Sequence, residues 1–323
     1  MGTQQKIPVA AVVGPTATGK TSLAIRLAQH YGGEIVSCDS MQIYQGLSVG
    51  TAKPTPEELG AVPHHLIGFQ PINQPFSVSD YVALAEKEIR RITDRGKRPF
   101  LVGGTGLYAR SLLQGISFEP ACRDDALRAQ LEREAETLGA PALYARLSEL
   151  DSQAASSIHP NNVKRVIRAL EYIQTTGERF SQQAERSQEV ESHYSYLMLC
   201  LVFRDRQKLY ARIDARVDAM LQAGLLEEAE GFWMETRQQD AQACTAAQAI
   251  GYKELFPYFE GKIALDAAVE NIKQESRRYA KRQITWFKKE RQIEFVCPDD
   301  YESSELLFRE AVRRIDRSGI FNQ

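Results

Sequence analysis

Cysteine is scarce and scattered in this chain of 323 residues. The five cysteines are odd in number, lie far apart and form no C-x-x-C pair, so we expect reduced thiols rather than disulfides or a zinc site. No apolar run approaches the roughly 18 residues of a membrane span. The first residues lack a signal-peptide core, and Lys6 stands where myristoylation requires Ser or Thr. These absences predict a soluble, cytoplasmic protein with no membrane partner.

An excess of charge of one sign is also absent. The formal net charge is −2, which gives no overall nucleic-acid signature, so any RNA or DNA binding has to come from a local patch. With 43% hydrophobic residues the chain can bury a substantial core, and its length suggests about two domains.

Eight residues near the start, GPTATGKT, match the phosphate-binding pattern G-x-x-x-x-G-K-[ST] without a mismatch. The apolar run at 7–13 before them predicts a buried strand, and residues 22–31 after them predict an amphipathic helix. Such a loop curls its N–H groups around one anion, Lys20 adds a compact cation, and the Thr21 hydroxyl can hold Mg²⁺. An ordinary glycine-rich turn is the alternative. We expect a diphosphate or triphosphate to be bound by Gly14, Pro15, Thr16, Ala17, Thr18, Gly19, Lys20 and Thr21.

Strand-like and helix-like segments alternate over the first ~115 residues, as expected for a parallel sheet covered on both faces. Strands are predicted at 34–37 and 99–102, with a helix at 79–95 between them. Because ligands bind at the carboxyl ends of parallel strands, the loops at 14–21, 37–42 and 103–106 should open onto one crevice.

Residues 120–192 differ in composition: they are rich in Glu, Arg, Ala, Leu and Gln, and their apolar residues recur at helical spacing. A strand pattern returns at 196–203. A helical block followed by a returning strand is typical of a domain inserted into an α/β core. We therefore predict an α/β, P-loop NTPase-like parallel sheet flanked by helices, formed by residues 1–117 and 196–323. Residues 118–195 would form an inserted, all-helical domain. Residues 206–291 are predicted to be helical.

Two basic clusters stand out in this near-neutral chain. Residues 273–291 hold eight Lys or Arg against two Glu, with aromatic residues interleaved, and Lys164, Arg165 and Arg168 lie on a predicted helix. They favour a polyanion that bridges them, although a solvated helix face is the alternative. His64 and His65 have no metal-ligand partners at suitable spacing and are interpreted as structural. Asp39 follows a strand and could be either functional or a simple turn residue.

Seven segments together resemble the tRNA dimethylallyltransferases, the bacterial isopentenyl-tRNA transferase family. They extend over nearly the whole chain: GPTATGKT at 14–21, SCDSMQIYQGLSVGTAKP at 37–54, LVGGTGLY at 101–108, HPNN…KR…RALE at 159–171, LYARIDARVDAM at 209–220, AIGYKE at 249–254 and KRQITWFK at 281–288. The resemblance implies transfer of a dimethylallyl group from its diphosphate to the N6 amine of the adenosine 3′-adjacent to the anticodon, releasing pyrophosphate.

The resemblance also implies roles for particular residues. Asp39 would accept the proton of the amine, Thr105 would position the amine or Asp39, and Arg216 would contact the diphosphate. Cofactors would be Mg²⁺ on Thr21 and dimethylallyl diphosphate as co-substrate; the partner would be the tRNA anticodon loop, with the enzyme a monomer and no obligate protein partner. Together with the basic clusters, the resemblance makes the inserted domain at 118–195 a tRNA-binding domain. It assigns tRNA binding to Asp39, Ser40, Met41, Gln42, Thr105, Arg128, Lys164, Arg165, Arg168, Gln248, Gly251, Tyr252, Lys253, Arg277, Lys281 and Arg282.

Three other functions share part of this pattern. A P-loop small-molecule kinase would explain the loop but not the basic clusters. A transferase acting on free AMP would need the loop and Asp39 but no inserted helical block. A non-catalytic RNA-binding ATPase would need a Mg²⁺-ligating Asp directly after an apolar strand, whereas Asp39 follows Ser37 and Cys38.

Overall fold

The computed structural model describes residues 6–116, 124–189, 192–238 and 245–322. The chain divides into two compact units: a core unit of Met1–Leu113 with His193–Gln323, and a helical unit of Gln114–Ser192. The sequence placed these borders at 117/118 and 195/196. The second border lies earlier in the structure because Tyr194 and Ser195 already pair with Ile7 and Pro8 in the sheet.

The core unit is built on a six-stranded, wholly parallel sheet in the order β3-β2-β4-β1-β5-β6. This confirms the predicted fold class and the four long strands. The two short edge strands, β3 and β6, were not predicted, because two or three residues carry too little periodicity. The strands are β1 (Ile7–Val13), β2 (Gly33–Ser37), β3 (His64–His65), β4 (Arg98–Gly103), β5 (Tyr194–Leu201) and β6 (Glu294–Val296).

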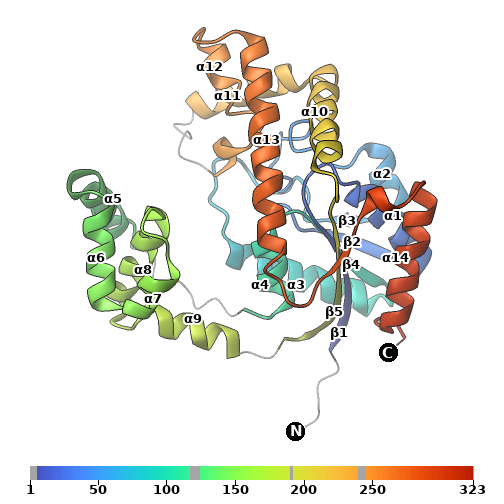
Figure 1. Ribbon diagram of the computed structural model, residues 1–323, viewed down its shortest axis with the longest axis horizontal. Coiled ribbons are helices and arrows are strands. Elements are labelled where there is room, and N and C mark those ends of the chain that lie inside the picture. Colours follow the sequence, from blue (N-terminus) through green and yellow to red (C-terminus); the bar gives the residue numbers. More distant parts are fainter. Residues whose placement is uncertain (1–5, 117–123, 190–191, 239–244, 323) are drawn as a thin grey trace. The chain divides into compact units, whose positions relative to one another are not determined.

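Helices cover both faces of this sheet (Figure 1). On one face, Ala10 and Val12 of the central strand pack with α1 (Lys20–Tyr31) and α14 (Ser304–Ser318). On the other, Val9, Ala11 and Val13 pack with α3 (Val78–Asp94) and α4 (Gly106–Leu113). Burial on both faces is why β1 is a continuous apolar run rather than an alternating one.

A further helical layer of the core unit lies beyond the carboxyl ends of the strands, at the top of Figure 1. It consists of α10 (Arg206–Gln222), α11 (Leu225–Gln238), the short η2 (Ala246–Gln248), α12 (Phe256–Phe259) and α13 (Leu265–Phe287). Its own apolar core includes residues of the segment 41–72, which also contains α2 (Pro56–Ala61). The mainly helical character of 206–291 was predicted. After α13 the chain adds β6, the short η3 (Pro298–Asp300) and α14.

The helical unit contains α5 (Asp125–Leu138), α6 (Ala140–Leu150), α7 (Ser152–Ser157), α8 (Val163–Thr176) and α9 (Phe180–Glu189). Leu131, Leu147 and Leu170 lie in its apolar core. Asn162 caps α8: its side chain accepts a hydrogen bond from the N–H of Arg165. Within the described parts of either unit, no helix is long and apolar enough to cross a membrane.

Candidate active site

The phosphate-binding loop joins β1 to α1 in a closed, hydrogen-bonded turn. Gly14 has φ of 136° and packs so tightly that an added Cβ would lie 2.4 Å from the carbonyl oxygen of Leu201. The Thr18 hydroxyl donates to the carbonyl of Pro15 at 2.9 Å, and Lys20 Nζ donates to the same oxygen at 2.6 Å. Because α1 begins at Lys20, the N–H groups of its first turn, which have no partner within the helix, lie on the same loop as the Lys20 ammonium.

Two cations and one carboxylate interact electrostatically near this loop. Burial and the nearby Arg216 lower the pKa of Lys20 from 10.5 to about 8, and Asp39 partly offsets this effect. Burial likewise lowers the pKa of Arg216, against the influence of Asp39. Two desolvated cations held together favour a multiply charged anion as their ligand.

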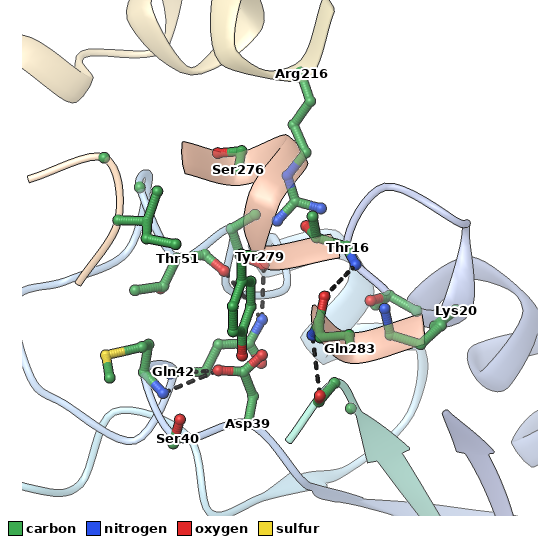
Figure 2. Close-up of a pocket in the computed structure, with 18 of the residues that line it drawn as sticks. Thr16, Lys20, Asp39, Ser40, Gln42, Thr51, Arg216, Ser276, Tyr279 and Gln283 are labelled. Carbon is green, nitrogen blue, oxygen red and sulfur yellow. Dashed lines mark hydrogen bonds between the residues drawn. The ribbon is translucent and has the colours of Figure 1, made fainter. Parts of the chain in front are cut away.

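Asp39 lies in a tight turn directly after β2. Its Oδ1 accepts hydrogen bonds from the backbone N–H of Met41 at 2.9 Å and of Gln42 at 3.4 Å. The Gln42 side chain in turn donates to the carbonyls of Thr51 and Ala52 at 3.2 and 3.0 Å. The turn geometry that the sequence left as an alternative is thus present, and it orients the carboxylate towards the site (Figure 2).

Thr105 binds the turn after β2 to the loop after β4. Its backbone N–H donates to the carbonyl of Cys38 at 3.1 Å, and its Oγ1 accepts from the N–H of Ser40 at 2.9 Å. Tyr279 of α13 also forms a side-chain hydrogen bond with Thr105, and burial followed by the neighbouring Asp39 raises the pKa of Tyr279. Thr105 therefore holds Ser40, and with it the turn that carries Asp39, through this hydrogen bond.

A cavity of about 290 Å³ opens among these loops and helices (Figure 2). Thr105 is not among its lining residues, and neither are the predicted loop residues Gly14, Pro15, Ala17, Thr18 and Gly19. The predicted site residues that do line it are Thr16, Lys20, Thr21, Asp39, Ser40, Met41, Gln42, Arg216, Gln248, Gly251, Lys253 and Arg282.

The residues present suit a magnesium–diphosphate complex better than a metal held by protein groups alone. Among the described residues, no three His, Cys, Asp or Glu side chains gather as a ligand set. Thr21 offers a hydroxyl at the cavity, one residue from Lys20. Mg²⁺ at phosphate sites takes few protein ligands and completes its shell with phosphate oxygens and water.

Tyr252 differs from its neighbours in the loop 248–253. Its side chain is fully buried, and its hydroxyl hydrogen-bonds to Glu228 of α11 and to the backbone of Gly50. Any RNA contact at this position would therefore have to involve the backbone, whereas Gln248 and Lys253 line the cavity with their side chains accessible.

Several cations of the basic segment of α13 are already paired with carboxylates. Arg277 is paired with Asp214 at 2.7 Å and with Glu270 at 2.8 Å, and Lys273 with Asp218 at 2.6 Å. Lys281 and Arg282, by contrast, are exposed, and Arg282 lies over the ring of Tyr279. Lys281 and Arg282 therefore offer positive charge to a polyanion beside the cavity.

In the helical unit, Lys164, Arg165 and Arg168 share the exposed side of α8. Arg128 is held by Glu171, with NH2 to Oε2 at 2.6 Å, which accounts for it structurally. Partial desolvation and the nearby Arg128 lower the pKa of Arg168, which also interacts electrostatically with Glu171. Because Arg168 already faces this carboxylate, Lys164 and Arg165 are the two members of the cluster whose charge is most available to phosphates.

Sequence reasoning missed several contributors to the site, Tyr279 among them. Gln283 and Ser276 line the cavity from α13, and Arg212 of α10 donates to the carbonyl of Ala17 in the phosphate loop at 2.9 Å. Their spacing was the available signal: 276, 279 and 283 recur on one helical face, and Arg212 precedes Arg216 by one turn. His64, expected to be structural, forms β3 and donates through Nδ1 to the carbonyl of Val62 at 2.7 Å, yet it also lines the cavity.

Comparison with known proteins gives a consistent family. The family model of the IPP transferases matches residues 42–290. A tRNA dimethylallyltransferase of Bacillus cereus (strain AH187) is 45% identical over 308 residues, 95% of this chain and 95% of that protein. One of Bacillus subtilis (strain 168) is 47% identical over 288 residues, 89% of this chain and 90% of the other.

Solved structures agree with the sequence comparison. The full-length tRNA isopentenylpyrophosphate transferase of Bacillus halodurans matches with a TM-score of 0.70 and 38% identity, over 98% of this chain and 99% of that one. A eukaryotic dimethylallyltransferase acting on tRNA matches with a TM-score of 0.85 and 28% identity, over 98% of this chain and 80% of the other. This chain belongs to the IPP transferase family, the tRNA dimethylallyltransferases.

Proposed function

We propose that this cavity transfers a dimethylallyl group from dimethylallyl diphosphate to the exocyclic N6 amine of the adenosine 3′-adjacent to the anticodon in tRNA. One observation carries the proposal: two partly buried cations, Lys20 and Arg216, share a single cavity with the carboxylate of Asp39. A diphosphate leaving group needs the cations, and an amine nucleophile needs the carboxylate.

The donor half is the phosphate loop with Lys20 and Arg216. As the bond between the prenyl carbon and the diphosphate oxygen breaks, negative charge grows on that oxygen, and these cations together with the N–H groups at the start of α1 stabilise it. Thr21 would hold the Mg²⁺, which when bound neutralises part of the diphosphate charge. The prenyl group leaves without any phosphoryl group being transferred.

The acceptor half is Asp39 with the residues that orient it. The adenine amine is a weak nucleophile, because its lone pair is delocalised into the ring. As the new nitrogen–carbon bond forms, one N6 proton passes to the Asp39 carboxylate, a step worth about 10²–10⁴-fold in rate. Thr105, by holding Ser40, keeps the turn that carries Asp39 in place.

The tRNA would contact the rim of this cavity and the helical unit. The target base is stacked in the anticodon loop and has to leave the stack to reach Asp39. At the cavity, the contacts would come from Ser40 to Gln42, Gln248, Gly251, Lys253 and Arg282, with the exposed Lys281 next to Arg282. Lys164 and Arg165 would add phosphate contacts from α8. We expect a monomer working in the cytoplasm, where its tRNA substrate is found.

The test is transfer of label from radioactive dimethylallyl diphosphate, with Mg²⁺, to unmodified tRNA, AMP or ATP. We expect label on the adenosine 3′ of the anticodon, with pyrophosphate released in equal amount. A tRNA carrying guanosine at that position is the matched control and should stay unlabelled. Label in AMP instead would indicate a free-nucleotide transferase, and loss of the ATP γ-phosphate to a small molecule would indicate a kinase; either result would contradict the proposal.

A further inference from the structure

The side chain of Gln283 joins two loops that are far apart in the sequence (Figure 2). Its Oε1 accepts a hydrogen bond from the backbone N–H of Thr16 at 3.0 Å. Its Nε2 donates to the carbonyl oxygen of Gly104 at 2.9 Å. One amide therefore connects the phosphate loop to the loop after β4.

The orientation of this amide is determined by its two partners. A backbone N–H only donates and a carbonyl only accepts, so turning the amide over would break both hydrogen bonds. Gln283 is 6% exposed, so water cannot readily replace either bond. The Gln283 amide fits only because residue 104 is a glycine: a Cβ at this position would lie 2.2 Å from Nε2 of Gln283.

The two loops continue neighbouring strands past the end of their pairing. In the sheet, Val13 of β1 lies opposite Gly103 of β4, the last pair of that register. Beyond it, one chain continues into the phosphate loop that carries Lys20, and the other into the loop that carries Thr105. Gln283 of α13 connects the two loops just past the last paired residues of the sheet.

We propose that Gln283 is a positioning residue for prenyl transfer. It fixes the distance between the donor half and the acceptor half of the site, acting through the two loops. Transfer requires the prenyl carbon and the amine to be held in near-attack geometry, where an error of about 1 Å costs on the order of 10²-fold in rate. The inference rests on the proposed function, because it assigns a donor and an acceptor half.

The first test is Gln283→Leu, which removes both hydrogen bonds at similar volume. We expect the single-turnover rate at saturating substrates to fall about 10²-fold, with tRNA affinity within about twofold of wild type. Gln274→Leu is the matched control, since Gln274 is exposed on the same helix, and it should keep the wild-type rate. A folded Gln283→Leu with the wild-type rate would overturn the inference.

Gly104→Ala disturbs the same pair of hydrogen bonds from the loop after β4. It tests the inference even if Gln283→Leu does not fold. Its new methyl group displaces the amide, so the rate should fall again while tRNA binding is kept. In the double variant the two losses should not add, because both remove one bridge. A Gly104→Ala protein with the wild-type rate, or fully additive losses in the double variant, would overturn the inference. Failure of the proposed function is distinct: the wild-type protein itself would then leave tRNA unlabelled.

Discussion

The Tyr252 hydroxyl donates a hydrogen bond to the carboxylate of Glu228, which also accepts from three consecutive backbone N–H groups. Ser48 donates to Oε2 at 2.9 Å, while Val49 and Gly50 donate to Oε1 at 2.9 and 3.2 Å. The segment held in this way continues to the carbonyls that bind Gln42, the neighbour of Asp39 in its turn. Glu228 therefore supports one wall of the cavity from α11.

Glu228→Gln should lower the free energy of unfolding by about 1–3 kcal/mol, because an amide nitrogen would face N–H donors that need an acceptor. Urea denaturation measures this difference. Glu230→Gln is the matched control: it makes the same change at an exposed position of the same helix and should be near neutral. Equal unfolding free energies for the two variants would contradict the supporting role of Glu228.

Local patterns predicted the parts of this site that depend on neighbours in sequence. The strand, loop and helix around GPTATGKT, and the turn at Asp39, are encoded within a few residues of one another. Contacts over long sequence distances were not accessible in the same way. The burial of Tyr252 depends on Glu228, and the pairing of Arg277 depends on Asp214 of another helix.

Composition alone does not show which cations are paired with carboxylates. Arg277 of the basic segment forms ion pairs with two carboxylates, and Arg128, a second candidate for tRNA binding, forms one with Glu171. Whether a cation is paired is decided by tertiary structure. Gln283 carries no charge and attracted no attention, yet it alone connects the phosphate loop to Gly104 through side-chain hydrogen bonds among the described residues.

Binding of dimethylallyl diphosphate should weaken as the pH rises above about 8. The free protein has a Lys20 pKa of about 8, so Lys20 is charged below that pH and neutral above it. The anion favours the charged form, and binding above pH 8 therefore takes up a proton. The affinity should then fall by up to about tenfold per pH unit.

Calorimetry in buffers of different ionisation enthalpy measures that proton directly. Lys20→Met is the control, which should bind more weakly at every pH and take up no proton at this site. Equal affinity on both sides of pH 8, with no proton uptake by the wild-type protein, would show that Lys20 does not meet the diphosphate.

Reversing the charge of both Lys164 and Arg165 to Glu should weaken tRNA binding and leave diphosphate affinity unchanged. Each lost phosphate contact should flatten the dependence of log affinity on log salt by about 0.7–1. Arg168 is left intact, because a carboxylate there would face the buried Glu171 and disturb its pairing with Arg128. Arg133→Glu, an exposed change on α5, serves as the control. If Arg133→Glu flattens the salt dependence as much per reversed charge as the α8 variant does, the prediction that α8 contacts the tRNA is wrong.

The most direct test of the account is the single-turnover rate of Asp39→Asn with dimethylallyl diphosphate and tRNA. Asparagine keeps an oxygen that can accept from Met41 and Gln42, so the turn should survive, but an amide cannot take the amine proton. We predict a rate about 10²–10⁴-fold below wild type, with tRNA affinity changed only a few-fold. A wild-type rate in the folded variant would contradict the role of Asp39 as the base and, with it, the division of this cavity into donor and acceptor halves.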